Sequence, residues 1–312
     1  MSDSGKYVNY NLRTSKSVER RMILITAKEL FKDIDISKCR YIGMGSTYFT
    51  DFKLFHRELH IENMISIEIE KKIIERVEYN KPYKCIDIKP GKSTDVLPTL
   101  DWRPDTKDFI WMDYDDTFDY DVFNDIEHIF SNIQQGSIYL MSCNKQLKDE
   151  DLTSFKEKFG ELVPNDIKTT DFSGENDFSL IGKMLKNKIE DVIIGRNHKL
   201  DVDKKLEFKQ LFFFTYKDNA PMISYGGYLD FQTNGHLNKY RLDFEFIKKG
   251  SERCHINPPN ISYKETTLLN TYLPNTETDY INEASIKFIP EGDRRKYREL
   301  YKYLPNYMDV IY

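Results

Sequence analysis

Long apolar segments are missing from this chain of 312 residues. No run reaches the roughly 18 apolar residues that a membrane-spanning helix needs, so we expect no membrane partner. The first residues also lack the apolar centre and the small-residue cleavage site of a secretory signal. We therefore expect a location in the cytoplasm.

Cysteine is scarce, and its spacing argues against two kinds of site. The four cysteines, Cys39, Cys85, Cys143 and Cys254, stand far apart and form no Cys-x-x-Cys pair. A zinc ribbon or a disulfide framework would need closer spacing, so neither is expected. Cys85 and Cys143 fall in segments that read as strands, where a role in the core is more typical than a nucleophile.

A strong charge of one sign is also absent, since the net charge is only −5. Nucleic acid is therefore neither indicated nor excluded as a partner. Basic residues do gather near both ends of the chain: Lys6, Arg13, Lys16, Arg20 and Arg21, then Lys287, Arg294, Arg295, Lys296, Arg298 and Lys302. Solvated helix faces are the commoner origin of such clusters. Composition says nothing about the oligomeric state.

What the chain does have is a regular alternation of strands and helices. Hydrophobic residues make up 39% of it, enough for a packed interior. Apolar runs predict strands at 39–43, 63–68, 83–88, 108–113 and 137–143, and helical periodicity predicts helices at 18–31, 47–59, 71–79 and 120–130. This alternation predicts an α/β, Rossmann-like fold with a mostly parallel sheet covered on both faces.

The second half of the chain departs from this rhythm. A helical insertion is expected at about 146–205, with helices at 152–159 and 178–194. Strands at 209–216 and 222–231, joined by a turn at 218–221, predict a terminal antiparallel hairpin. A further strand is expected at 240–247, followed by two tail helices around Leu268 and Leu300. We thus expect a helical lead-in over 1–36, a Rossmann-like domain over 37–247 and a helical C-terminal extension over 248–312.

A glycine-containing loop follows the first expected strand. Gly43 and Gly45 let the backbone approach a ligand closely, with Ser46 beside them, and Glu68 ends the next strand 25 residues after Gly43. An acid at that position is placed to accept hydrogen bonds from ribose hydroxyls. A dinucleotide site would have a third glycine near Tyr48, so S-adenosylmethionine (SAM) fits better than NAD.

The first half, over about 37–145, resembles the class I SAM-dependent methyltransferases, and in particular bacterial O-methyltransferase-like sequences. The resemblance implies that the glycine loop cradles the methionine part of SAM and that Glu68 binds the ribose. It also implies that Lys92 and Ser93, after the third strand, flank the adenine, although many members carry an acid in that loop. An acid often precedes the glycine loop as well, where this chain has Arg40.

The segment Asp113-Tyr114-Asp115-Asp116 stands at the carboxyl end of the fourth strand, where open parallel sheets bind their ligands. We expect Asp113 to face the methyl group of SAM and to act as a general base or orient the acceptor. Tyr114 would form a wall of the pocket. Asp115 and Asp116 would bind a divalent cation or, equally well, cap the following helix.

These features predict a SAM-dependent methyltransferase, most simply one that transfers the methyl group to an oxygen of an unidentified acceptor. Two alternatives stay open. One is a SAM- or nucleotide-binding protein without methyl transfer, and the other is a nucleic-acid methyltransferase with a continuous basic rim beside the pocket. The polar residues of the N-terminal helix would form a lid or contact the acceptor, but an ordinary surface helix is the default expectation.

Overall fold

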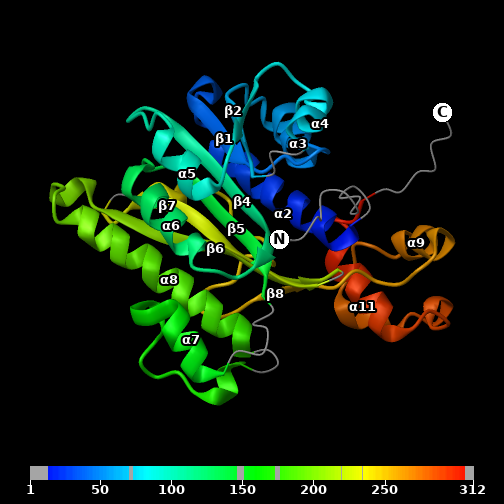
Figure 1. Ribbon diagram of the computed structural model, residues 1–312. Coiled ribbons are helices and arrows are strands. Elements are labelled where there is room, and N and C mark those ends of the chain that lie inside the picture. Colours follow the sequence, from blue (N-terminus) through cyan, green and yellow to red (C-terminus); the bar gives the residue numbers. More distant parts are fainter. Residues whose placement is uncertain are drawn as a thin grey trace.

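A twisted central sheet with helices on both faces forms the main body of the protein, and a small group of helices lies to one side of it (Figure 1). The computed structural model describes residues 13–69, 73–145, 151–172, 176–218, 220–233 and 235–305. Among these residues, no helix is both long and apolar enough to cross a membrane.

The sheet has eight strands in the order β3-β2-β1-β4-β5-β7-β6-β8. The strands are β1 (Cys39–Gly43), β2 (Met64–Glu68), β3 (Ile86–Pro90), β4 (Lys107–Thr117), β5 (Ile138–Asn144), β6 (Leu206–Lys217), β7 (Pro221–Phe231) and β8 (Cys254–Ile256). Strand β7 runs against its neighbours, β5 and β6, whereas the other pairs are parallel. The Rossmann-like fold class and the antiparallel hairpin are therefore confirmed.

One expected strand is wrong. Residues 240–247 pair with no strand in the described part of the chain, and the last strand is instead the short β8, which lies parallel to β6. The apolar residues of 240–247 pack against the core as an irregular segment: Tyr240 contacts Tyr228, and Phe244 stacks on Phe246. Alternating hydrophobic residues indicate that one side of a segment is buried. An extended segment that lies on the core shows the same pattern, even when its backbone pairs with no strand.

Helices cover both faces of the sheet. They are α2 (Thr14–Phe31), α3 (Thr50–Leu59), α4 (Ile74–Asn80), α5 (Ser93–Val96), α6 (Asp121–Asn132), α7 (Leu152–Phe159), α8 (Asn176–Asn197), α9 (Tyr263–Asn270), α10 (Glu277–Asn282) and α11 (Glu291–Leu300). One core packs α2 and α3 against the sheet, and the other packs α6, α7 and α8 against the opposite face. Along β4, Trp111 belongs to the first core and Met112 to the second, because successive strand residues point to opposite faces.

The expectation that the N-terminal helix is an ordinary surface helix is wrong. Twelve of the 18 residues of α2 are buried. They include the charged residues Lys16, Glu19 and Arg20, whose exposed fractions are 1%, 0% and 5%. The helix therefore presents a polar stretch to the sheet as well as an apolar one, and its charged groups need partners there.

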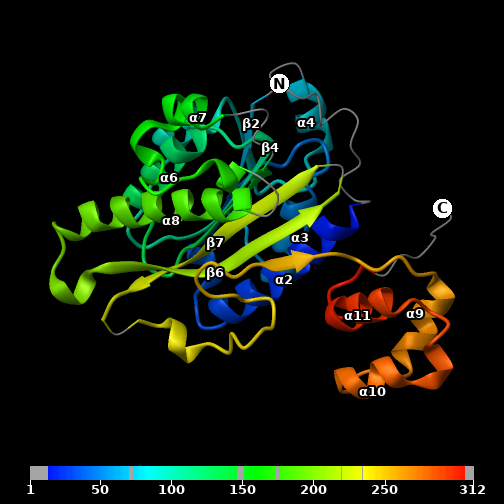
Figure 2. The ribbon, with the colours of Figure 1, turned by 90° about the horizontal axis from the view of Figure 1, so that it is seen from below.

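The C-terminal helices form a separate small core, visible apart from the sheet in Figure 2. It is built from Leu269, Tyr280, Ile281, Ile286, Ile289 and Tyr297. One basic residue of this region serves its interior: Arg294 is 4% exposed and donates to the carbonyls of Ile281 and Ile289. Arg295 pairs with Glu277 and Glu291. Of the two basic clusters, Lys16, Arg20 and Arg294 are thus not on solvated helix faces, and Lys6 lies outside the described residues.

Candidate functional site

The loop after β1 has an unusual backbone. Ser46 has φ 51° and Phe49 has φ 49°, values that residues other than glycine seldom adopt. A Cβ atom on Gly45 would lie 2.5 Å from the Phe49 ring and 2.7 Å from Ser66 Oγ. Glycine at 45 is therefore required by the close packing beneath the loop, and any side chain there would displace the loop.

Glu68 holds this loop in place. Its Oε1 atom accepts hydrogen bonds from the Gly45 N–H at 3.0 Å, the Ser46 N–H at 3.1 Å and the Ser66 hydroxyl at 2.6 Å. The Ser66 hydroxyl oxygen also accepts from the Gly45 N–H at 3.0 Å. The sequence pointed to Glu68 as a ribose ligand, and the structure adds that its carboxylate shapes the loop. Its ribose role stays a prediction.

Lys92 and Ser93 stand beside this loop but differ in environment. The Gly91 N–H donates to the Glu68 carbonyl at 2.9 Å, so the segment after β3 is tied to the end of β2. Ser93 begins α5 and is buried, whereas Lys92 is half exposed, 3.7 Å from the Asp121 carboxylate. Their roles beside adenine stay predictions, with Ser93 in the interior and Lys92 at the rim.

The residues expected to be catalytic do not lie together. The Tyr114 hydroxyl donates to Asp125 Oδ2 at 2.6 Å, and its ring packs against the core under α6. Asp113 instead contacts α2 on the opposite face. β4 continues to Thr117 and α6 begins only at Asp121 after Tyr120, so the expected capping by Asp115 and Asp116 is wrong. The Asp115 side chain lies outside the described part of the structure.

Asp113 forms an ion pair with Lys16, a residue for which the sequence predicted only a place in the N-terminal helix. Lys16 Nζ lies 2.8 Å from Asp113 Oδ1 and 2.9 Å from Glu19 Oε2. The ammonium also lies 4.4 Å from the centre of the Trp111 ring and 3.5 Å from Ser142 Oγ. One buried cation thus contacts two carboxylates and an aromatic face at the carboxyl edge of β4.

Neutral hydroxyl groups complete this cluster from the neighbouring strands. Ser142 on β5 accepts a hydrogen bond from Trp111 Nε1 at 2.9 Å and lies 2.7 Å from the Ser224 hydroxyl on β7. The Tyr216 hydroxyl on β6 donates to Glu19 Oε2 at 3.1 Å. The network therefore joins α2 to four strands, and Glu19 has one further oxygen, Oε1, with no hydrogen-bond partner among the described residues.

The surroundings shift the pKa values of two members of this network. Burial alone would lower the pKa of Lys16, but the carboxylates of Asp113 and Glu19 outweigh it and raise that pKa well above its usual value. Burial raises the pKa of Glu19, against the opposing effect of Lys16. Lys16 is therefore a permanent cation, while Glu19 takes up a proton more readily than an exposed glutamate.

The next residue of α2 ties the helix to the far side of the glycine loop. Arg20 Nε donates to Asp51 Oδ1, and both side chains are buried. Asp51 belongs to the first turn of α3, where a carboxylate also complements the helix dipole. Through Lys16 and Arg20, α2 fixes the end of β4 and the start of α3 relative to each other.

Asp125 lies on α6, on the opposite face of the sheet from α2. We expect its buried carboxylate to lower the unfolding free energy at neutral pH. Burial raises its pKa from 3.8 to about 6, although the Ser93 and Tyr114 hydroxyls act in the opposite direction. A raised carboxyl pKa means that the folded state binds the proton more tightly, so stability is lost as pH rises towards and through 6. Asp125→Asn should therefore raise the unfolding free energy above pH 7 by up to about 3 kcal/mol, with little effect at pH 4.

Urea unfolding from pH 4 to 8 measures this change. Glu127→Gln provides the control, because Glu127 lies on the same helix with its side chain 62% exposed and does not contribute to the pKa shift of Asp125, so it should leave the pH dependence unaltered. A variant at Asp125 whose stability still falls with pH as steeply as the unmodified protein would contradict the expectation.

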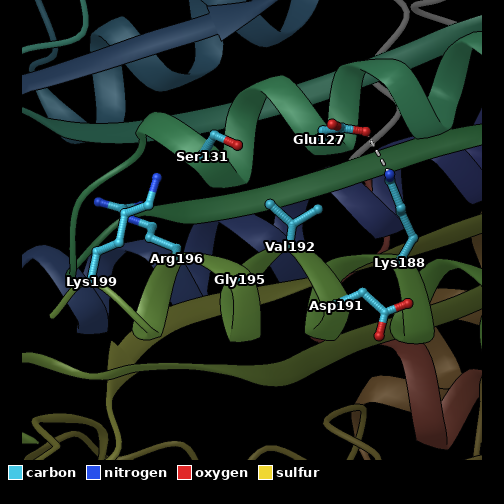
Figure 3. Close-up of a pocket in the computed structure, with 8 residues that line it drawn as sticks. All are labelled: Glu127, Ser131, Lys188, Asp191, Val192, Gly195, Arg196 and Lys199. Atoms are coloured by element: carbon cyan, nitrogen blue, oxygen red, sulfur yellow. Dashed lines mark hydrogen bonds and ion pairs between the residues drawn. The ribbon is translucent and has the colours of Figure 1, made fainter.

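Two further features bear on the location of a site: metal-binding groups and a surface hollow. The described residues hold no group of three or more His, Cys, Asp or Glu side chains suited to a metal ion. A surface hollow of about 520 Å³ lies between α6 and α8 (Figure 3), where Glu127 pairs with Lys188. Arg196 within it donates to the carbonyls of Phe130 and Ile133 at the last turn of α6. The hollow is therefore at the opposite end of α6 from the carboxyl edge of the sheet.

The family comparison decides the assignment of the chain. A family model with the description "Putative O-methyltransferase" matches residues 8–312, nearly the whole length. The chain belongs to this family. A search among curated proteins found no match.

Solved structures with a similar fold share little sequence with this methyltransferase-family protein. A LepI variant, solved with SAH and a substrate analogue, is 9% identical with a TM-score of 0.36, and the match covers 65% of this chain but only 46% of LepI. The O-methyltransferase TomG from Streptomyces achromogenes, solved with SAM, is 14% identical with a TM-score of 0.38, over 72% of this chain and 93% of TomG. Cofactor-bound Rv0187 from MTB is 11% identical with a TM-score of 0.37, covering 72% and 84%.

Proposed function

We propose that this protein transfers a methyl group from SAM to an oxygen atom of an acceptor, at the carboxyl edge of strands β1, β2 and β4. The observation that carries this proposal is the convergence of the Gly45 and Ser46 N–H groups on Glu68 Oε1. It places an acid and a close-packed glycine loop side by side in a protein of an O-methyltransferase family.

The residues present fit a ligand without phosphates. Gly45 lets the loop pack closely on Phe49 and Ser66, which keeps its backbone in the shape that Glu68 holds. Thr47, in the same loop, is buried, and its hydroxyl oxygen has no hydrogen-bond partner among the described residues. A polar ligand would satisfy that atom, which otherwise costs free energy in the interior.

The roles of individual residues follow from their places at this edge. SAM, when bound, supplies a methyl group on a positively charged sulfonium. Gly43, Gly45 and Ser46 would hold its methionine part, and Glu68 would accept from the ribose hydroxyls. Asp113 would accept the hydrogen bond, and then the proton, of the acceptor hydroxyl. We assign Tyr114 to holding Asp125 rather than to the acceptor, because its hydroxyl already donates there.

Calorimetric titration with SAM and S-adenosylhomocysteine (SAH) tests the proposal. The unmodified protein should bind both with micromolar dissociation constants, near −8 kcal/mol. Glu68→Ala should weaken binding by at least about 100-fold, because it removes a charged hydrogen-bond acceptor and releases the loop. A protein that binds neither compound but binds NAD or ATP would retain only the fold, not the function.

Ser66→Ala separates the two effects of Glu68. Its hydroxyl supports the loop from below through Glu68 and Gly45, so this variant should weaken binding about tenfold, by loosening the loop alone. Equal losses in the two variants would show that Glu68 acts only on the shape of the loop and does not contact the ribose.

The remaining sequence predictions are not changed by these arguments. A cytoplasmic location and domain boundaries near residues 36 and 247 stay predictions. The nucleic-acid alternative required a continuous basic rim, and the burial of Lys16, Arg20 and Arg294 removes three of the residues that would have formed it.

A further inference from the structure

Asp113 and Lys16 differ in how far they reach towards solvent. The Asp113 side chain is 15% exposed, whereas those of Lys16 and Glu19 are 1% and 0% exposed. The carboxylate is therefore the part of this charge cluster that a ligand meets, and the ammonium lies directly beneath it. Any ligand charge near Asp113 interacts with both, and the balance between them sets the local potential.

The register of the sheet places this pair beside the glycine loop. Trp111 is the partner of Gly43 across β1 and β4, so Asp113, two residues further on, emerges at the same edge as Gly45.

The methyl donor and its product differ in charge at the sulfur atom, which is the reacting end of both molecules. SAM carries a positive sulfonium, and SAH carries a neutral thioether. A lone carboxylate at this edge would favour the donor, whereas a carboxylate paired with an ammonium discriminates less.

We propose that Lys16 is a specificity-determining residue that balances the charge of Asp113, and so sets the relative affinity of the site for donor and product. This inference rests on the proposed function, since it takes the reacting end of SAM to face Asp113. The groups that face Lys16 come from every element packed against it: Glu19 and Arg20 from α2, Trp111 and Asp113 from β4, Ser142 from β5 and Tyr216 from β6. Arg20, the other buried cation of α2, is engaged by Asp51.

The ratio of the dissociation constants for SAH and SAM measures this balance without any acceptor. In Lys16→Gln, the ratio should move about tenfold in favour of SAM at pH 8 to 9, equivalent to about 1.4 kcal/mol. The shift should shrink towards pH 6, because burial raises the pKa of Glu19, which would then take up a proton in place of the lost ammonium. Lys16→Arg should keep the ratio of the unmodified protein, and so should Lys28→Gln, which removes an exposed lysine from the same helix.

A purely structural role for Lys16 predicts a different result. Both compounds would then weaken equally in Lys16→Gln, and an unmoved ratio would overturn the inference. If Lys16→Gln does not fold, Asp113→Asn decides: with Lys16 unopposed by Asp113, the ratio should move about tenfold against SAM, and no movement would refute the proposal. An unmodified protein that binds neither compound defeats the proposed function itself, whereas binding with an unmoved ratio defeats this inference alone.

Discussion

Replacing Gly226 by alanine should lower the unfolding free energy by at least about 3 kcal/mol. A Cβ atom at this position of β7 would lie 2.2 Å from the Tyr139 carbonyl oxygen and 2.8 Å from Leu140 Cα. Both are backbone atoms of β5, so the clash is relieved only if the two strands move apart. Ser224, two residues away on β7, contacts Ser142, and the movement would therefore also open the polar network under Asp113.

Urea unfolding followed by circular dichroism measures this loss. Gly195→Ala is the matched control, because a Cβ there meets no atom within 4 Å and the residue lies inside α8. It should gain about 0.5–1 kcal/mol, since alanine favours a helix more than glycine does. Gly227→Ala should repeat the loss, with a Cβ 2.0 Å from the Lys209 carbonyl oxygen. A Gly226→Ala variant as stable as the unmodified protein would mean that β5 and β7 tolerate separation.

The strands of the first half could be predicted because their burial is visible in the sequence. β1 and β2 are buried at all five positions, and short apolar runs between helical segments are typical of parallel strands covered on both faces. The short β8 could not be predicted, since Cys254–Ile256 carries too little apolar sequence and depends on pairing with β6. The prediction of a strand at 240–247 failed for a different reason. Its hydrophobic pattern arises from contact with the core, and such contact requires no backbone hydrogen bonds to a neighbouring strand.

The opposed directions of Asp113 and Tyr114 were predictable, because neighbouring residues of a strand point to opposite faces. Placing both in one pocket overlooked this alternation. The partner of Asp113 was not predictable, since Lys16 lies 97 residues away. A weak signal did exist: Lys16 and Glu19 share a helix face with the buried residues Ile23 and Ala27. A charged residue on an apolar face indicates a buried partner without identifying it.

The buried pair of Arg40 and Asp108 gives the second large expected effect. These residues are direct partners across β1 and β4, with Arg40 Nε 2.7 Å from Asp108 Oδ1 and both side chains at most 6% exposed. Arg40 also donates to the Asp101 carbonyl at 2.7 Å and lies 5.0 Å from the centre of the Trp102 ring. Arg40→Met should cost about 3–5 kcal/mol, because it leaves the carboxylate buried without a cation.

The double variant Arg40→Met, Asp108→Leu should recover most of that loss, because two apolar side chains replace a buried pair at little net cost. Burial raises the pKa of Asp108, so the deficit of the single variant should shrink as pH falls and the carboxyl group takes up its proton. Urea unfolding at pH 5 and pH 8 measures both effects. If the double variant is no more stable than the single one at either pH, Arg40 acts mainly through Asp101 and Trp102, by holding the segment before β4 against the sheet.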